Sequence, residues 1–210
     1  MRRKICISFF LFALIASFPL SSYAAGNWYY GSGNYVSSAP VKPTTGLKFY
    51  VDYSAITTYG SGAFTAAFDW NGDYKGNVAA VAMYPASSSS YPGYFLISTK
   101  TMLITTKGET FYYTSSGTLI SDTYPMDSTS IYKCEIRLNS DKSAFNVNGS
   151  FDSTYLKKTI RHEVGHVFLL KHPSNFYFSS VMHQGVPNGS IIAETITYDD
   201  KDNIIAKWGL

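Results

Sequence analysis

His162-Glu163-Val164-Gly165-His166-Val167-Phe168-Leu169-Leu170-Lys171-His172 is the stretch on which the interpretation of this sequence rests. His162 and His166 are four residues apart, so on a helix they lie on one face, one turn apart, and can bind the same metal ion. Glu163 can then reach a water molecule on the open side of that metal. The alternative is a helix with ordinary core or surface histidines. The chain has 4 histidines, all between residues 162 and 183, and this concentration favours a zinc site.

The third ligand that a catalytic zinc needs beside its open position is predicted at His172. Six residues separate it from His166, or about 600° around a continuing helix, which would point its ring away from the metal. The helix must therefore end between the two histidines. Pro173 helps, because the residue before a proline is pushed out of the helical region. We expect a turn near 169–171 that brings His172 back to the zinc.

These residue types also predict a reaction. Neutral imidazole ligands leave zinc a strong Lewis acid, which polarises a carbonyl and lowers the pKa of a bound water from about 16 to about 7. Glu163 would take the proton from that water and later pass it to the leaving amine. The peptide bond is the usual amide outside a cell. The pattern therefore predicts a zinc metallopeptidase with Glu163 as its catalytic residue.

Residues 1–25 are predicted to be a signal peptide. A basic start at 2–4 is followed by the apolar stretch 5–20, and Ser22-Tyr23-Ala24 offers small residues for cleavage. The alternative is an amino-terminal membrane anchor, for which the apolar stretch is short. We therefore expect a secreted protein that is not attached to a membrane after cleavage.

Charge and cysteine content exclude several classes of protein. The chain has 17 Lys+Arg against 14 Asp+Glu, but three of the bases lie in the signal peptide, so the rest is neutral and predicts no nucleic-acid partner. Cys134 is the only cysteine left after residue 25, so no intramolecular disulfide is expected. It lies in an alternating apolar run, which favours a buried packing role over a nucleophile.

The remaining chain is predicted to form one α/β domain that acts as a monomer. Residues 26–46 show no periodicity and are interpreted as an extended lead-in or a short pro-segment, followed by a catalytic domain over 47–210. Hydrophobic patterns predict strands at 47–51, 78–83, 94–97, 101–105, 110–114 and 131–138. They predict helices at 60–70, at 154–170 with Ser153 as its N-cap, and at 199–207.

One segment suggests calcium. Asp69-Trp70-Asn71-Gly72-Asp73 looks like part of an EF-hand loop, but the acidic group that such a loop needs at its twelfth position is replaced by Ala80. We interpret the segment as a turn, and a structural Ca²⁺ ion has no further support in the sequence.

The whole motif, His162-Glu163-x-x-His166-x-x-x-x-x-His172, resembles the signature of metzincin zinc peptidases. In that family a glycine stands at the position of Leu169 and makes a sharp turn at positive φ, which would cost a leucine about 1–2 kcal/mol. Ser179-Ser180-Val181-Met182-His183 resembles the family's Met-turn in wording close to astacins. The resemblance gives Met182 the role of packing beneath the zinc histidines. The extra tyrosine ligand of astacins is Gln184 here.

Other segments resemble matrixin-like metzincins. These are the strand at 136–139, the helix at 63–71 and the carboxy-terminal helix at 202–209. The resemblance implies a single domain of the α/β (α+β) class, with a twisted, mostly parallel sheet, an antiparallel edge strand, an active-site helix and a carboxy-terminal helix. It also implies a peptide or protein substrate that lies antiparallel to the sheet edge, next to a pocket walled by Met182–Ile192.

Two alternatives stay open. The third zinc ligand could be Glu194, as in a gluzincin, although it lies 28 residues beyond His166. The chain could also be a binding or adhesion module on a metalloprotease fold that has lost its activity. The intact Glu163 favours an enzyme, because a purely structural zinc site needs no base beside its ligands.

Overall fold

The computed structural model describes residues 34–35, 47–74, 78–81, 83–85, 94–120, 130–173, 179–184 and 193–208. The predicted signal peptide and most of the predicted lead-in lie outside these residues. Within the described part of the chain, no helix has the length and apolar character that crossing a membrane would require.

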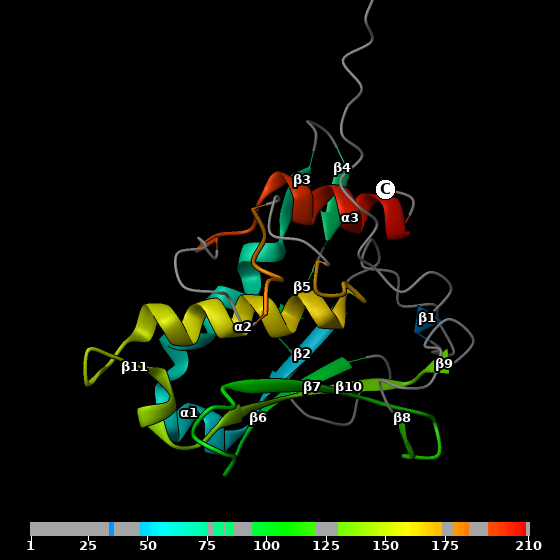
Figure 1. Cartoon of the computed structure of the whole chain (residues 1–210). Helices are drawn as coiled ribbons and strands as arrows, with labels where there is room; N and C mark the ends of the chain where they lie inside the picture. The colour runs from blue at the N-terminus through cyan, green and yellow to red at the C-terminus, as the bar shows by residue number, and fades with distance from the viewer. Residues whose placement is uncertain are drawn as a thin grey trace, which may run out of the picture.

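A six-stranded mixed sheet forms one layer of the fold (Figure 1). In spatial order its strands are β5 (Met83–Pro85), β2 (Leu47–Val51), β6 (Tyr94–Lys100), β10 (Lys133–Asn139), β7 (Gly108–Tyr113) and β8 (Leu119–Ile120). The first four run parallel, β7 is antiparallel to β10, and β8 is antiparallel to β7. The predicted mixed α/β class with a mostly parallel sheet is thus confirmed.

Most of the predicted strands are present. The predictions at 47–51, 94–97 and 110–114 correspond to β2, β6 and β7, and the one at 131–138 to β10, preceded by β9 (Ser130–Ile131). The single strand predicted at 78–83 is wrong. It is divided into β4 (Val78–Val81), which pairs with β3 (Gly72–Tyr74), and β5 of the main sheet.

The strand predicted at 101–105 is also wrong, because this segment is the loop between β6 and β7. Its apolar side chains point to solvent, with Leu103 77% exposed and Ile104 51% exposed. The carbonyls of Leu103 and Thr106 accept hydrogen bonds from Nδ2 of the buried Asn139 at 3.0 and 2.8 Å. Two hydrogen bonds from the buried side-chain amide of Asn139 thus fix the loop that leads into β7.

Two short pairings complete the strands. β1 (Asn34–Tyr35) runs parallel to β9, and β11 (Asn146–Val147) forms a hairpin with β12 (Ser150–Phe151). Asn148 and Gly149, the two residues between these strands, have φ of 52° and 83°. Positive φ at both central residues is what a two-residue hairpin turn requires.

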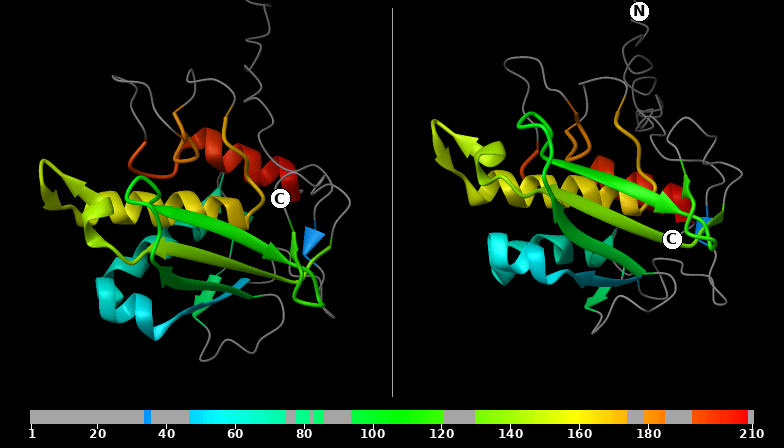
Figure 2. Two further views of the ribbon diagram at one scale, coloured as in Figure 1. Left: turned by 60° about the horizontal axis from the view of Figure 1, so that its bottom comes forward. Right: turned by 90° about the horizontal axis from the view of Figure 1, so that it is seen from below.

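The long helix α2 (Ser153–Val167) carries the motif across one face of the sheet, beside β10 and β7 (Figures 1 and 2). It buries Leu156, Ile160, Val164 and Val167 along one side, at the spacing of an amphipathic helix. Its N-cap is Asp152 and not the predicted Ser153, because the Asp152 carboxylate accepts from the amides of Thr154 and Tyr155. Cys134 of β10 is fully buried, as predicted for a packing role.

Four further helices of the described residues lie around α2 and the sheet: α1 (Tyr53–Tyr59), the 3₁₀ helices η2 (Ser61–Trp70) and η3 (Lys142–Phe145), and α3 (Tyr198–Trp208). The helices predicted at 60–70 and 199–207 are thus present as η2 and α3. α2 lies between the sheet and α3 (Figure 1; Figure 2, left). Trp70 of η2 donates its indole N–H to the carbonyl of Arg161, and Trp208 of α3 donates to that of Phe168.

The helix predicted over 154–170 ends at Val167, in a turn of defined geometry. The amide of Leu170 donates to the carbonyl of Gly165 at 3.1 Å, and that of Leu169 donates to His166 at 2.8 Å. These two bonds form a Schellman motif, in which the residue after the C-cap is left-handed and is usually glycine. Leu169 has this position and a φ of 64°. The expected turn is therefore present, with leucine in the glycine conformation.

Burial compensates for the strain in this turn. The left-handed conformation costs a leucine about 1–2 kcal/mol, and full burial of its side chain stabilises by about 1.5–3 kcal/mol. Leu169 is 0% exposed and belongs to the hydrophobic core. The same side chain that strains the turn therefore anchors it.

We predict that Leu169→Ala destabilises the protein more than Leu169→Gly does. Both substitutions remove the buried side chain, at a cost of about 2–5 kcal/mol. Only alanine keeps the penalty for positive φ, so the two variants should differ by about 1 kcal/mol, measurable by urea unfolding. Equal stability of the two variants would show that the turn relaxes when the side chain is removed.

Candidate metal centre

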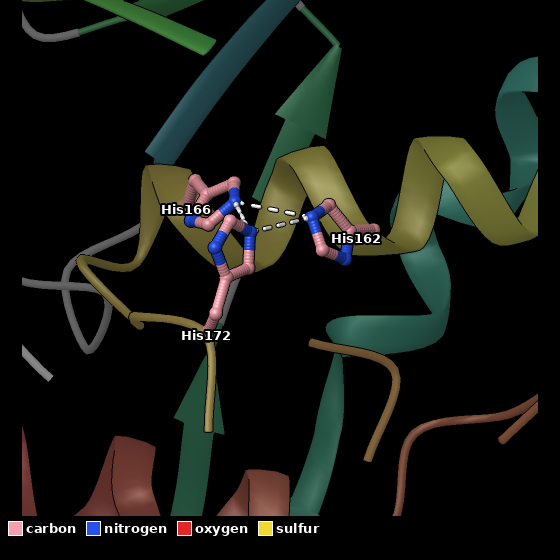
Figure 3. A group of neighbouring side chains, drawn as sticks. All are labelled: His162, His166 and His172. Carbon is pink, nitrogen blue, oxygen red and sulfur yellow. Dashed lines mark hydrogen bonds between the residues drawn. The ribbon is translucent and has the colours of Figure 1, made fainter. Parts of the chain in front are cut away.

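Three imidazole rings converge at the end of α2 (Figure 3). The Nε2 atoms of His162 and His166 are 3.2 Å apart, and the Nε2 atom of His172 lies 3.1 and 3.0 Å from them. A tetrahedral zinc with nitrogen ligands at about 2.0–2.1 Å separates two of those nitrogens by about 3.3–3.4 Å. The three Nε2 atoms are therefore within a few tenths of an ångström of the spacing that a shared ion requires.

The opposite ring nitrogens of the two helical histidines face backbone carbonyls. Nδ1 of His162 lies 2.8 Å from the carbonyl oxygen of Val181, and Nδ1 of His166 lies 2.8 Å from that of Leu170. A carbonyl oxygen only accepts, so Nδ1 carries the proton in both rings, and in a neutral ring Nε2 then carries a lone pair. Two lone pairs 3.2 Å apart repel each other unless a cation lies between them.

The surroundings favour the neutral form of these rings. Burial lowers the pKa of His162, and it lowers that of His166 still further, with the neighbouring His162 and His172 acting in the same direction. Protonation therefore does not relieve the repulsion near neutral pH. A metal ion would relieve it, because a cation can accept the lone pairs of neutral imidazole rings. Among the described residues, His162, His166 and His172 form the one group of histidine, cysteine or acidic side chains close enough to hold a metal ion.

Glu163 lies on the same helix, at the junction of two clefts. Its side chain is buried, and Oε2 accepts a hydrogen bond of 2.7 Å from the hydroxyl of Thr110 in β7. Burial raises its pKa from 4.5 to about 7, an effect that the bond from Thr110 partly opposes. A carboxylate with a pKa near neutrality can both take up and release a proton at physiological pH.

Gly108 gives Glu163 its place beside the sheet. A β-carbon at residue 108 would lie 3.0 Å from Cγ and 3.1 Å from Oε1 of Glu163, and 2.9 Å from Cγ2 of Thr159. Any larger residue at this position would force the side chains of Thr159 and Glu163 to shift. Neither Thr110 nor Gly108 gives a recognisable signal in the sequence, because their roles depend on the pairing of β7 with β10 beneath the helix.

Met182 packs against the helix at Gly165. It is fully buried, and a β-carbon on Gly165 would collide with its sulfur atom and lie 3.1 Å from its Cε. Gly165 precedes His166, so Met182 packs against the backbone between the two helical histidines. The glycine at 165 is required by this close approach.

The segment that carries Met182 is fixed by Asp200, which sequence reasoning missed. Asp200 is fully buried near the start of α3 and accepts bonds from the hydroxyl of Ser180, the amide of Val181, and the amide and hydroxyl of Thr197. The carbonyl oxygen of Val181 in turn accepts a hydrogen bond from Nδ1 of His162. Asp200 therefore orients a histidine through one intervening residue.

The other residues singled out in the sequence lie outside the histidine cluster. His183 is buried and lines the smaller of the two clefts. Glu194, the alternative third ligand, places its carboxylate 3.0 Å from Nζ of Lys158, in an ion pair. Asp69, the first residue of the suspected calcium loop, forms an ion pair of 2.6 Å with Arg161. The carboxylates of Glu194 and Asp69 thus form ion pairs with basic side chains.

Two clefts meet at Gly108, Glu163 and Gln184. The larger, of 740 Å³, extends along β7 past His166 and His172 to Ile120. The smaller, of 420 Å³, extends the other way, between residues 105–107 and the first turns of α2. Both volumes are in the range of ligand-binding clefts.

Comparison with known proteins adds little to this description. No protein-family model and no curated protein sequence matches the chain. Among solved structures, a chain of the GM1-bound form of the ECX AB5 holotoxin is similar at 14% sequence identity and a TM-score of 0.49, over 86% of this chain and 87% of that one. A likeness of this degree carries no argument about fold or function.

We predict that metal-free protein loses stability as the pH rises from 4.5 to 7, relative to Glu163→Gln. The folded pKa of Glu163 is raised, so the unfolded chain releases this proton first and rising pH favours unfolding. The loss attributable to Glu163 is about 3 kcal/mol and is complete above pH 7. Urea unfolding of both proteins with a chelator measures it, and the difference between them cancels the contribution of the histidines. Parallel curves for the two proteins would contradict the raised pKa.

Proposed function

We propose that this protein is a secreted, zinc-dependent endopeptidase that hydrolyses peptide bonds of extracellular proteins. His162, His166 and His172 would hold the zinc ion, and Glu163 would be the general base. The observation that carries the proposal is the convergence of the three Nε2 atoms at 3.0–3.2 Å, with the Nδ1 protons of two rings already engaged by carbonyls. This arrangement supports the proposal that the three Nε2 atoms bind one cation.

The donor set fits zinc. Imidazole is a preferred zinc ligand, and three protein ligands with an open fourth position are typical of catalytic sites. Zinc bound there supplies a Lewis acid that polarises the substrate carbonyl and makes water more acidic. The clefts on both sides of Glu163 give the open side room for a substrate.

Glu163 is suited to move the proton. Thr110 binds Oε2, which leaves Oε1 to accept a proton from the attacking water and to deliver it to the leaving amine. The high pKa that burial gives this carboxyl suits both steps. An intact and oriented base supports hydrolysis over the alternative of a binding or adhesion module that has lost its activity.

The edge of β7 offers a place for the substrate backbone. β8 covers β7 only at Tyr112 and Tyr113, so in the described part of the chain Gly108–Phe111 have no strand partner on the outer side. An extended peptide can add to such an edge through main-chain hydrogen bonds. Antiparallel addition is slightly more stable than parallel addition, and it agrees with the orientation that the metzincin resemblance implies.

We predict one zinc ion per chain, bound through His172 and not through Glu194. His172→Ala should weaken zinc binding at least about 10-fold to 100-fold, because it removes a ligand, and Glu194→Gln should leave binding unchanged. Competition with a chromophoric chelator measures both affinities. Loss of zinc in Glu194→Gln with retention in His172→Ala would show that Glu194, and not His172, is the third ligand.

We predict that the zinc-loaded protein cleaves an unfolded substrate such as casein, and that Glu163→Gln lowers kcat by about 100-fold to 10,000-fold. The variant should keep its zinc and its fold, because glutamine can still accept the bond from Thr110. Glu135→Gln is the matched control, since it makes the same change at a residue of β10 that lines neither cleft. If the intact, zinc-loaded protein cleaves neither casein nor any member of a broad peptide library, the binding module becomes the better description.

A further inference from the structure

The two clefts that meet at Glu163 differ in the chemistry of their walls. Among the described residues, the larger one is lined by Phe111, Tyr112, Leu119 and Ile120, and its charged residues are Glu109, Lys171 and the shared Glu163. The smaller one is lined by Lys107 and Lys158, and in the part of the chain that the structure describes its one acidic lining residue is Glu163. One end of the substrate site is therefore apolar and the other carries two positive charges.

We propose that the smaller cleft selects an acidic side chain, so that the enzyme cuts on the amino-terminal side of aspartate or glutamate. This inference rests on the proposed peptidase function. β7 starts at Gly108, beside the smaller cleft, and runs toward Tyr113, beside the larger one. A peptide antiparallel to β7 thus enters along the apolar cleft and leaves along the basic one, and the residue after the cleaved bond faces the lysines.

Lys107 is placed firmly at this end of the site. Its carbonyl accepts a hydrogen bond of 2.9 Å from the amide of Asn139, whose side chain binds two other carbonyls of the same loop. Its Nζ lies 5.3 Å from the ring centroid of Tyr155, which also lines the cleft. The backbone is fixed, and the ammonium group remains close to the cavity.

Lys158 lies one turn before His162 on α2, and its ammonium is 3.0 Å from a carboxylate oxygen of Glu194. The Glu194 side chain is 67% exposed, and an ion pair with so exposed a member contributes little to stability. A substrate carboxylate can therefore share or replace this partner. Glu194 weakens the positive field of the cleft and should moderate the selectivity.

The volume of the cleft does not distinguish acidic from neutral side chains. At 420 Å³ it has room for any common residue, so shape alone gives no preference between glutamate and glutamine. The pair differs only in charge, and two lysines should favour the charged member on the order of tenfold. A peptide pair that differs only in this residue therefore isolates the effect of the lysines.

The test uses the full chain loaded with zinc and quenched fluorescent peptides that differ only after the cleaved bond, with Glu, Gln, Lys or Leu there. We expect a kcat/KM ratio of Glu to Gln on the order of tenfold, lowered about twofold to fivefold by Lys107→Gln and by Lys158→Gln. Glu194→Gln should raise it roughly twofold. Lys157→Gln is the matched control, because Lys157 is the neighbour of Lys158 and lines neither cleft.

Efficient cleavage with a Glu to Gln ratio near one would overturn this inference and leave the peptidase intact. So would an acidic preference on the other side of the cleaved bond, or a ratio that neither lysine substitution changes. If no peptide is cleaved, the proposed function fails. The Kd values of the same Glu and Gln peptides for zinc-loaded Glu163→Gln, from fluorescence anisotropy, then decide the acidic preference independently.

Discussion

The reversal of the chain at Leu169 is the constraint on which the candidate site depends. The turn ends α2 two residues before Leu169, and it sends His172 back to the face of the helix that carries His162 and His166. It also supplies the carbonyl of Leu170 that fixes the tautomer of His166. A helix that continued for one more turn would lose the third ring and this carbonyl together. The strained φ of Leu169 is therefore tied to the chemistry of the site, and the burial of its side chain maintains it.

The site is built from segments that are distant in the sequence, each tied to the next by a buried or partly buried hydrogen bond. Asp200 of α3 holds Val181, and Val181 holds His162. Thr110 of β7 holds Glu163, and Tyr112 of the same strand donates to the carbonyl of His166. The sheet thus orients the base from one side of α2, and the segment before α3 orients a histidine from the other. Because these bonds lie in a poorly hydrated environment, breaking any of them costs more than it would at the surface.

The spacing of the two helical histidines and most strands of the main sheet could be predicted from the sequence because both depend on local periodicity. The spacing of His162 and His166 follows from the helix alone, and the alternation in β10 follows from the strand alone. The need for a turn before His172 could also be deduced, since six residues of helix point a side chain away. The supporting residues could not be deduced. Thr110 and Asp200 reach the site only through the register of β7 and the docking of α3, and neither leaves a periodic pattern.

Two of the sequence-based errors have a similar origin. The segment at 101–105 has the composition of a strand, but the side chain of one buried residue, Asn139, engages its carbonyls and holds it as a loop. Similarly, composition does not separate Ser153 from Asp152 as the N-cap, because either side chain can accept from the first amides of the helix. In both cases the outcome depends on hydrogen bonds that only the three-dimensional structure reveals.

Close packing limits which substitutions this site tolerates as strictly as its polar contacts do. Gly165 lets the sulfur of Met182 approach the helix between the two histidines, and Gly108 lets Glu163 lie against β7. Without a cation, the folded chain also buries the carboxyl group of Glu163 and holds the imidazole lone pairs close to one another. Both features lower its stability. These costs are removed when a divalent ion binds, because its charge attracts the lone pairs and the carboxylate alike. Folding and metal binding should therefore be strongly coupled in this protein, through the same few residues that would carry out the reaction.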